Sequence, residues 1–476
     1  MYGETMLLPA IPDIIKEFNI SYNTSSWILS AYLIAGAVST PVAGKLSDIY
    51  GRKKMIMIIM IIYIIGISLG GLSTNITFLV VARVIQGIGI SMFPIAFGII
   101  RDQFPKEKLA IGVGVFSAMF AAGSVVGLVL GANIIEHFGW RTTFFSIVFV
   151  AVGLWLIIRR YIHDKADSVA VIDESLESKI PVHSNDIKTN VTRRRNMISS
   201  SKNIDIKGTI TLAATIISFL MILSYSQTDG TENRQLYFFM VLGVISLILF
   251  MFIERRSNSP LVNFQLMTNK TILSANIILF VAFLAMFAIF QTIPVLVRTP
   301  QPLGFGESVT TTASIQLPFM IVFLLFAPSS GYIVSKLGNV KPTIIGSIVS
   351  TLGFFSLFFF HSDGIVVAIS LAVIAGGLAL MQVGGFDIIL QSTPPRFSGI
   401  SLGMTVLFNL IGGAVGPAIA GIYMQTNQVF IQGLAASFPS PVSYDLIFFT
   451  IAILSLVPVA LSIFIKRLPL KVPLEP

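Results

Sequence analysis

Arg83 is the only basic residue of this chain that falls within a long apolar stretch. A charged side chain at the centre of a bilayer costs at least about 2.5–3.5 kcal/mol, so it usually forms an ion pair or serves a function. Gln86 lies three residues later on the same helix face. Glu4 is the candidate acid, because a buried carboxyl group can hold a proton and release it when water or a cation approaches. Asp387 is the second candidate, although its position equally suits a charge at the membrane interface.

A dense charge cluster, "GKLSDIYGRKKM" (44–55), separates two apolar runs. Lys53 and Lys54 fit the tendency of cytoplasmic loops to collect Lys and Arg. That tendency explains neither the carboxylate of Asp48 nor the two glycines of the cluster, and glycine permits tight turns and close backbone approach. The cluster therefore predicts a docking function in addition to a topology signal.

The composition indicates a membrane protein with many spans. The chain has 476 residues, of which 54% are hydrophobic and 11% charged, against about 25% charged in soluble domains. The chain has no Cys, which excludes disulfides and thiolate chemistry, and its four His lack metal-ligand spacing. No phosphate-binding loop is present, so we expect neither ATP as an energy source nor any cofactor or metal.

The apolar runs predict an all-α protein, because a spanning helix needs about 20 mostly apolar residues. Thirteen runs qualify: 26–43, 55–72, 77–100, 109–135, 141–158, 208–225, 236–253, 272–297, 313–334, 343–360, 364–390, 399–424 and 444–465. The stretch "MYGETMLLPAIPDIIKEF" before them resembles the end half of another helix, closing at Pro12. It is too short to cross a bilayer, so we expect a truncated first helix and fourteen spans in all.

The Lys and Arg residues fix an orientation. When the 44–54 loop is placed in the cytoplasm, all but five of the 31 Lys and Arg fall in inside segments. Both termini are then cytoplasmic. The net charge of +9 reflects the orientation of the chain in the membrane and does not indicate a nucleic-acid-binding surface. The polar stretch 159–206 is expected to be a disordered linker, in which Arg193–Arg195 act as a topology signal or contact lipid headgroups.

Two pairs of segments repeat along the chain. "GKLSDIYGRKK" (44–54) matches "GYIVSKLGNVK" (331–341), and "GSVVGLVLG" (123–131) matches "GGAVGPAIAG" (412–421), at nearly equal spacing. Parallel repeats with a substrate site between them at mid-membrane are typical of secondary transporters. The predicted division is a six-helix bundle (1–158), the linker (159–206), an inserted helix pair (207–256), a second six-helix bundle (257–466) and a tail (467–476).

The sequence resembles the major facilitator superfamily, specifically its fourteen-helix drug:proton antiporter branch, over essentially its whole length. Three signatures carry the resemblance, together with "GWRTTFF" (139–145) and the segment 254–277. They are the loop signature at Gly44, Leu46, Asp48, Gly51, Arg52 and Lys53, the helix 4 signature at Arg83, Gln86, Gly87 and Gly89, and the antiporter glycine motif at Gly123, Gly127 and Gly131 with its second-half copy Gly412, Gly416 and Pro417.

The resemblance implies roles for these residues. The loop signature would latch the two halves together on the cytoplasmic side, with Asp48 facing the helix start at Ser398 or, alternatively, Arg101. Arg83 would couple protonation to substrate movement, with Glu4 as the acid. The glycine ladder would pack against a helix of the other half. The family pattern has Pro where this chain has Leu128, which weakens the case for antiport.

The resemblance implies a proton-coupled efflux transporter that exports hydrophobic or cationic compounds by alternating access, and not an enzyme. A monomer in the cell membrane, working on a small-molecule substrate and protons, is expected. The alternatives are a metabolite uniporter or symporter of the same fold, and a membrane-embedded receptor or enzyme on this scaffold. Six residues could line the substrate cavity, although such side chains often only pack or face lipid: Trp27, Tyr32, Met119, Phe120, Phe290 and Gln291.

Overall fold

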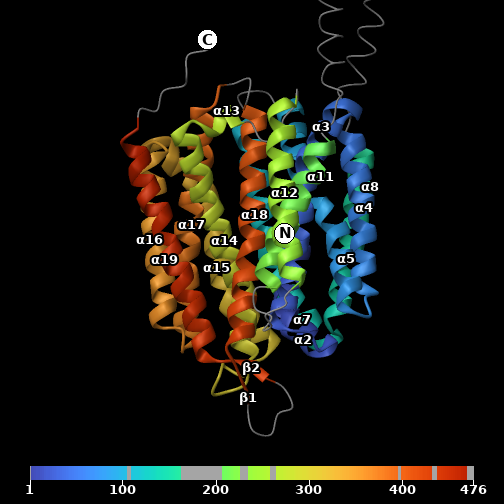
Figure 1. Ribbon diagram of the computed structural model, residues 1–476, viewed down its shortest axis with the longest axis vertical. Helices are drawn as coiled ribbons and strands as arrows, with labels where there is room; N and C mark the ends of the chain where they lie inside the picture. The colour runs from blue at the N-terminus through green and yellow to red at the C-terminus, as the bar shows by residue number, and fades with distance from the viewer. Residues whose placement is uncertain are drawn as a thin grey trace, which may run out of the picture.

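The computed structural model is a bundle of long helices that stand side by side (Figure 1). It describes residues 2–103, 109–161, 206–225, 234–257, 264–394, 398–430 and 437–468. Within these ranges the side chains of more than twenty positions, among them Asp48, Arg101, Phe120 and Ser398, lie outside the described part. Large hydrophobic side chains that are fully buried, such as Phe144, Phe287 and Phe448, lie between the helices.

The first half begins with three short helices that continue one another and is followed by the longer ones. Their bounds are α1 Tyr2–Thr5, η1 Leu8–Ala10, α2 Ile11–Phe18, α3 Tyr22–Tyr50, α4 Arg52–Gly71, α5 Ile76–Gly87, η2 Ile88–Ser91, α6 Met92–Gln103, α7 Leu109–Phe138 and α8 Trp140–Tyr161. The inserted pair is α11 Ile206–Tyr225 and α12 Arg234–Arg256.

The second half repeats the pattern of long helices. Its elements are α13 Phe264–Met267, α14 Lys270–Arg298, α15 Val309–Leu337, α16 Val340–Phe359, α17 Gly364–Ser392, α18 Ser398–Thr426, β1 Gln428–Phe430, β2 Ser437–Pro439 and α19 Pro441–Lys466. In the described part of the chain, eleven helices are long and apolar enough to cross a membrane, and two shorter apolar helices lie at 122–138 and 207–222. These thirteen segments coincide with the thirteen predicted runs.

One short antiparallel pair of strands departs from the prediction of an all-α chain. Strand β1 pairs with β2, with Val429 opposite Phe438. Three-residue strands are too short to give a periodic sequence signal, and this pair sits in the connection before α19. The fold is thus nearly all-helical.

The two halves repeat local structure as well as sequence. Ser21 and Ser308 both cap the helix that follows, because each side chain accepts a hydrogen bond from a backbone N–H in the first turn. Gly51 and Gly338 both have positive φ, +92° and +77°, at the tight turns after α3 and α15. The register that pairs Gly44 with Gly331 in the sequence repeat pairs both of these sets of residues.

The ends of the bundle differ. We call the end that carries the 44–54 turn, α13 and the end of α19 the basic end, and it is at the top of Figure 1. The opposite end carries α2 and the β1–β2 pair, and we call it the hairpin end. Contacts between α3 and α18 and between α7 and α15 join the halves.

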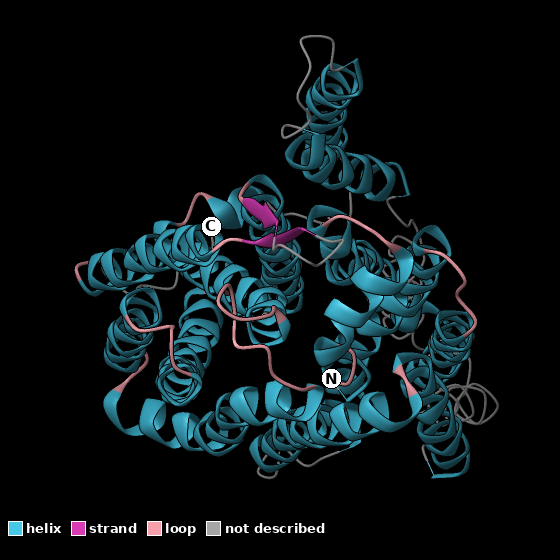
Figure 2. Cartoon of the chain, turned by 90° about the horizontal axis from the view of Figure 1, so that it is seen from below, coloured by secondary structure: helices cyan, strands magenta, loops and turns pink. Residues whose placement is uncertain are grey.

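The inserted pair lies outside the ring formed by the two halves (Figure 2). Helix α11 packs against α3 and α18, and α12 packs against α11. An added Cβ at Gly243 would lie 3.3 Å from Ser218, and Thr215 donates a hydrogen bond to Ser246 at 3.1 Å. Small and polar residues therefore hold the two inserted helices together, as in other membrane helix pairs.

Candidate functional site

Glu4 and Arg83 are brought together inside the first half. Glu4 lies on α1 with 6% of its surface exposed, and Arg83 lies on α5 with none exposed. The two charges interact electrostatically, and the rings of Tyr32 and Tyr63 lie in the same electrostatic environment. A buried carboxyl group and a buried guanidinium thus lie near enough in the first half to influence one another electrostatically.

Arg83 is held by three neighbours. Its Nε donates a hydrogen bond to the Ile28 carbonyl oxygen at 2.8 Å, and its Nη1 donates to Gln86 Oε1 at 2.8 Å. Its guanidinium carbon lies 4.5 Å from the centre of the Tyr32 ring, an arrangement that attracts a cation to the ring face. These contacts fix the orientation of the guanidinium and explain why the helix 4 signature contains Gln86.

Three polar atoms of this cluster have no hydrogen-bond partner in the described part of the chain. They are Glu4 Oε1, Arg83 Nη2 and Gln86 Nε2. Buried polar atoms are nearly always paired, and an unpaired one at a functional site marks a position where a proton, water or ligand can bind. The hydrogen bonding of the cluster is therefore incomplete, so a proton, a water molecule or a ligand can bind there.

Glycines allow the backbones around the cluster to approach closely. A Cβ added at Gly87 would lie 2.2 Å from the Tyr32 carbonyl oxygen, and one at Gly89 would lie 2.4 Å from the Tyr63 ring. A Cβ added at Gly3 would lie 2.9 Å from the Tyr63 hydroxyl oxygen. The sequence analysis missed Tyr63, although a lone phenol within an aliphatic helix was a usable signal.

The chain also matches known families and proteins over this architecture. The sequence model of the Major Facilitator Superfamily matches residues 1–232 and 209–417. The chain belongs to the major facilitator superfamily. It is a transporter, not an enzyme, and a multi-pass membrane protein.

Several curated proteins resemble this transporter. Multidrug resistance protein 3 of Bacillus subtilis is 27% identical over 443 residues, covering 91% of this chain and 78% of that protein. The tetracenomycin C resistance and export protein of Streptomyces glaucescens is 25% identical over 428 residues, covering 89% of this chain and 73% of that protein. The human organic anion transporter MFSD10 shares the fold at a TM-score of 0.61 and 13% identity, over 97% of this chain and 95% of that one.

Asp387 does not join the cluster. It lies on α17 in the second half, where its Oδ2 accepts a hydrogen bond from Gln391 Nε2 at 2.6 Å. One of its partners is therefore a neighbour on its own helix. Within the described residues, no group of three or more His, Asp or Glu side chains could hold a metal ion.

The predicted cavity residues have different surroundings. Trp27 packs against the hydrophobic core, and Tyr32 lies under Arg83. Phe290 is buried with its ring centre 5.4 Å from that of Phe319. Met119 is 65% exposed, and Phe120 lies outside the described side chains. Gln291 on α14 donates a hydrogen bond from Nε2 to Ser25 Oγ on α3 at 2.9 Å, so it joins the two halves.

The glycine ladders have a different partner from the predicted one. A Cβ added at Gly127 would lie 2.4 Å from the Tyr2 carbonyl oxygen, and one at Gly131 would lie 2.6 Å from Met6 Cα. Both neighbours belong to the first segment of the same half, α1 and the turn that follows it. The expectation that this ladder faces the other half was therefore wrong. The spacing of the glycines predicts which face of a helix carries small residues, but it does not predict which neighbouring helix packs on that face.

The second-half ladder has the matching partner. Cβ atoms added at Gly412 and Gly416 would lie 2.3 Å and 2.2 Å from the carbonyl oxygens of Phe280 and Leu284. Both of these oxygens belong to α14, which follows the inserted pair as the first long helix of the second half. Each ladder thus fixes the first helix of its own half.

The loop signature is described only in part. Arg52 Nη1 donates a hydrogen bond to the Gly98 carbonyl oxygen on α6, a contact within the first half. An added Cβ at Gly44 would meet no atom of the described residues within 4 Å, so the predicted close approach is not seen among them, whereas Gly51 makes the predicted turn. The latch partners proposed for the loop, Asp48 with Ser398 or Arg101, fall on side chains outside the described part.

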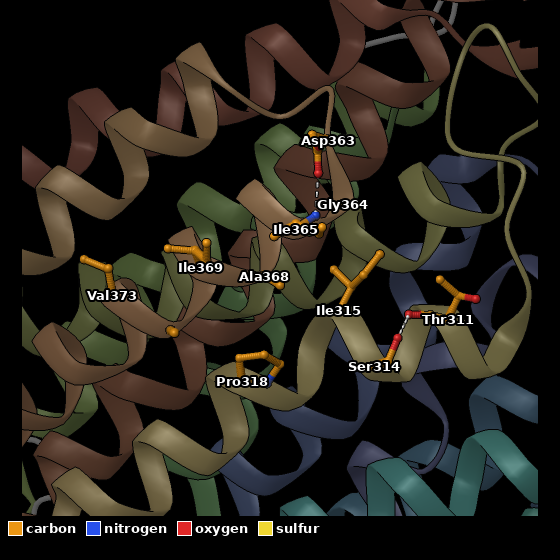
Figure 3. A pocket seen from close by; sticks show the side chains of 11 residues that line it. Thr311, Ser314, Ile315, Pro318, Asp363, Gly364, Ile365, Ala368, Ile369 and Val373 are labelled. Atoms are coloured by element: carbon orange, nitrogen blue, oxygen red, sulfur yellow. Dashed lines mark hydrogen bonds between the residues drawn. The ribbon is translucent and has the colours of Figure 1, made fainter.

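A pocket of about 550 Å³ lies between α15 and α17 (Figure 3). Asp363 caps α17 at its mouth by accepting a hydrogen bond from the Ile365 amide at 2.7 Å. Ile365 and Ile369 are exposed, so the pocket opens on the outer surface of the second half. It is separate from the Glu4–Arg83 cluster, and we do not assign it to the transport path.

Proposed function

We propose that this transporter exports hydrophobic or cationic compounds in exchange for protons, by alternating access between its two halves. The observation that carries the proposal is the buried Glu4–Arg83 cluster, in which Glu4 Oε1, Arg83 Nη2 and Gln86 Nε2 have no hydrogen-bond partner among the described residues. The printed names of the relatives, among them multidrug resistance protein 3 and the tetracenomycin C resistance and export protein, support the substrate class.

The proposed coupling uses the charges of the cluster. When Glu4 is ionised, its negative charge offsets the positive charge of Arg83. When a proton binds Glu4, the guanidinium keeps its charge without a counter-ion, and the arrangement of helices that gives water or substrate access to the cluster becomes favoured. A cationic substrate near Glu4 stabilises the ionised carboxylate, as Arg83 does. Proton and substrate therefore compete for one site.

We further propose the orientation of this cycle. The basic end faces the cytoplasm of a bacterial cell, with both termini on that side, because it carries most of the Lys and Arg. The transporter works as a monomer, since one chain supplies both halves of the site. The predicted cytoplasmic latch at Asp48 remains part of this proposal.

Purified protein in proteoliposomes tests the coupling. An imposed pH gradient should drive accumulation of a fluorescent cationic dye, and the Glu4→Gln variant should lose this response while dye binding without a gradient persists. The matched control is Glu17→Gln, which removes an exposed carboxylate from the neighbouring α2. Gradient-driven transport that survives in Glu4→Gln would reject Glu4 as the proton carrier.

The same assay separates antiport from symport or uniport. Leu128 lies where the family pattern has Pro and is fully buried on α7. This difference from the antiporter pattern keeps symport and uniport as alternatives. Antiport predicts dye movement opposite to the proton gradient. Dye movement along the proton gradient would indicate symport, and movement that ignores the gradient would indicate a uniporter.

A further inference from the structure

Two helix ends at the hairpin end are capped by the opposite half. Glu136, in the last turn of α7, accepts a hydrogen bond through Oε2 from the Thr310 amide in the first turn of α15, at 3.2 Å. Gln425, in the last turn of α18, accepts one through Oε1 from the Tyr22 amide in the first turn of α3, at 3.1 Å. Each contact satisfies an amide that a helix start leaves without an intrahelical partner.

The two caps are equivalent positions of the internal repeat. The register that pairs Gly123 with Gly412 also pairs Glu136 with Gln425. The capped helices, α3 and α15, carry the other repeated motif, and their N-cap serines are equivalent as well. A similar cap therefore occurs twice across the boundary between the halves, once with a charged acceptor and once with a neutral one, and the two donor amides differ by one position in the repeat.

An ion pair closes the same end. Arg298 Nη2, at the end of α14, lies 2.5 Å from Asp13 Oδ1 on α2, and both side chains are about three-quarters buried, at 23% and 28% exposed. A pocket of about 250 Å³ beside it is lined by Asp13, Glu136, Trp140, Arg298 and Ser308 among others. The ion pair and the charged cap thus border one polar pocket at the boundary between the halves.

Further contacts between the halves lie deeper along the same boundary. Ser30 Oγ on α3 donates a hydrogen bond to the Ala414 carbonyl oxygen on α18 at 2.7 Å. Leu33 lies beside Gly413, where an added Cβ would be 3.2 Å away. With a rise of about 1.5 Å per residue, these positions lie within about 20 Å of the hairpin end. The halves are therefore interlocked from that end towards the middle of the bundle.

We propose that Glu136, Gln425 and the Asp13–Arg298 pair form the gate that closes the hairpin end, and that they act as positioning residues in the transport cycle. This inference rests on the proposed alternating access, because a gate has a function only if the halves move apart. Each contact joins the two halves, so all of them must break when the hairpin end opens. A typical intramolecular hydrogen bond changes such an equilibrium by about 2- to 10-fold.

The chain itself supplies a control for this gate. Glu17 Oε1 lies 2.6 Å from Arg141 Nη1, also at the hairpin end, but both residues belong to the first half. Removing that ion pair changes the charge of the same surface but breaks none of the contacts named above that join the two halves. A gate variant therefore loses a contact between the two halves, whereas this control loses a contact within the first half.

Pulsed electron paramagnetic resonance on spin-labelled protein tests the gate, and the absence of native Cys makes labelling specific. The reporter is the pair Leu72→Cys and Phe360→Cys, exposed positions on different halves at the hairpin end. Glu136→Ala and Asp13→Ala should each raise the longer-distance population about 2- to 10-fold. The control Glu17→Ala should leave the distance distribution unchanged.

Conservative variants separate the gate from loss of folding. Glu136→Gln should keep the parent distribution, because Gln425 caps the equivalent helix with an amide. The charge exchange Asp13→Arg with Arg298→Asp should restore the distribution that either single change disturbs. An unchanged distribution in Glu136→Ala and Asp13→Ala, or equal opening in Glu17→Ala, would overturn the gate. Because the readout is a distance, a failure of proton coupling in the dye assay would leave this result interpretable.

Discussion

Substituting Gly416 by Ala tests how tightly α18 packs on α14. The added Cβ would lie 2.2 Å from the Leu284 carbonyl oxygen and 2.8 Å from the Ala288 amide nitrogen. Both are backbone atoms, so no side chain can rotate away and the two helices must separate. Overpacking of this kind costs about 1–3 kcal/mol, while replacing Gly by Ala within a helix gains up to about 1 kcal/mol.

We therefore expect Gly416→Ala to lower the free energy of unfolding by about 1–2 kcal/mol, since contact with backbone puts the cost at the upper end of the range. The matched control is Gly403→Ala on the same helix, where an added Cβ meets no atom of the described residues within 4 Å. That variant should be more stable than the parent by about 0.5–1 kcal/mol. The first-half counterpart, Gly127→Ala, should behave like Gly416→Ala.

The assay is unfolding in mixed micelles by increasing mole fraction of sodium dodecyl sulfate, followed by far-ultraviolet circular dichroism. Parent, Gly416→Ala and Gly403→Ala are compared under one condition, so that the difference between the two variants measures the steric cost. If Gly416→Ala were as stable as the parent while Gly403→Ala gained stability, the close packing of α18 on α14 would be refuted.

Two further predictions concern polar groups. Partial burial raises the pKa of Glu17, but hydrogen bonds from Trp140 and Arg141 outweigh it, so the pKa lies below its ordinary 4.5. This pairing stabilises the fold at neutral pH and is lost as the pH falls below 4.5, so the difference in Tm between parent and Glu17→Gln should vanish in acid. Gln86→Leu removes the acceptor for Arg83 Nη1, and should abolish gradient-driven dye transport while circular dichroism shows unchanged helix content.

The sequence predicted the spans because lipid imposes a single strict requirement on each of them. About 20 apolar residues are needed to cross, and helices such as α14 and α17 meet that requirement with little ambiguity. The burial of Arg83 was predictable for the same reason, since a lone cation in an apolar run must find a protein partner. Its contact with Gln86 followed from helix spacing alone.

Contacts between distant segments were much harder to predict. The spacing of Gly127 and Gly131 identifies a small helix face, but only packing decides that residues 2–6 cover it. The pairing of Asp13 with Arg298 depends on how two halves meet, and nothing local to either residue signals it. The unpaired Oε1 of Glu4 is likewise a property of the assembled site.

The inserted pair breaks the symmetry of the duplicated architecture. Helix α11 lies on both α3 and α18, with Leu212, Ile216 and Leu220 buried along one face. The equivalent boundary between α7 and α15 lies on the other side of the repeat. Among the described residues, α11 and α12 pack on the α3–α18 boundary and not substantially on the α7–α15 boundary. We therefore expect a hydrophobic molecule dissolved in the bilayer to enter the protein from the side of α7 and α15.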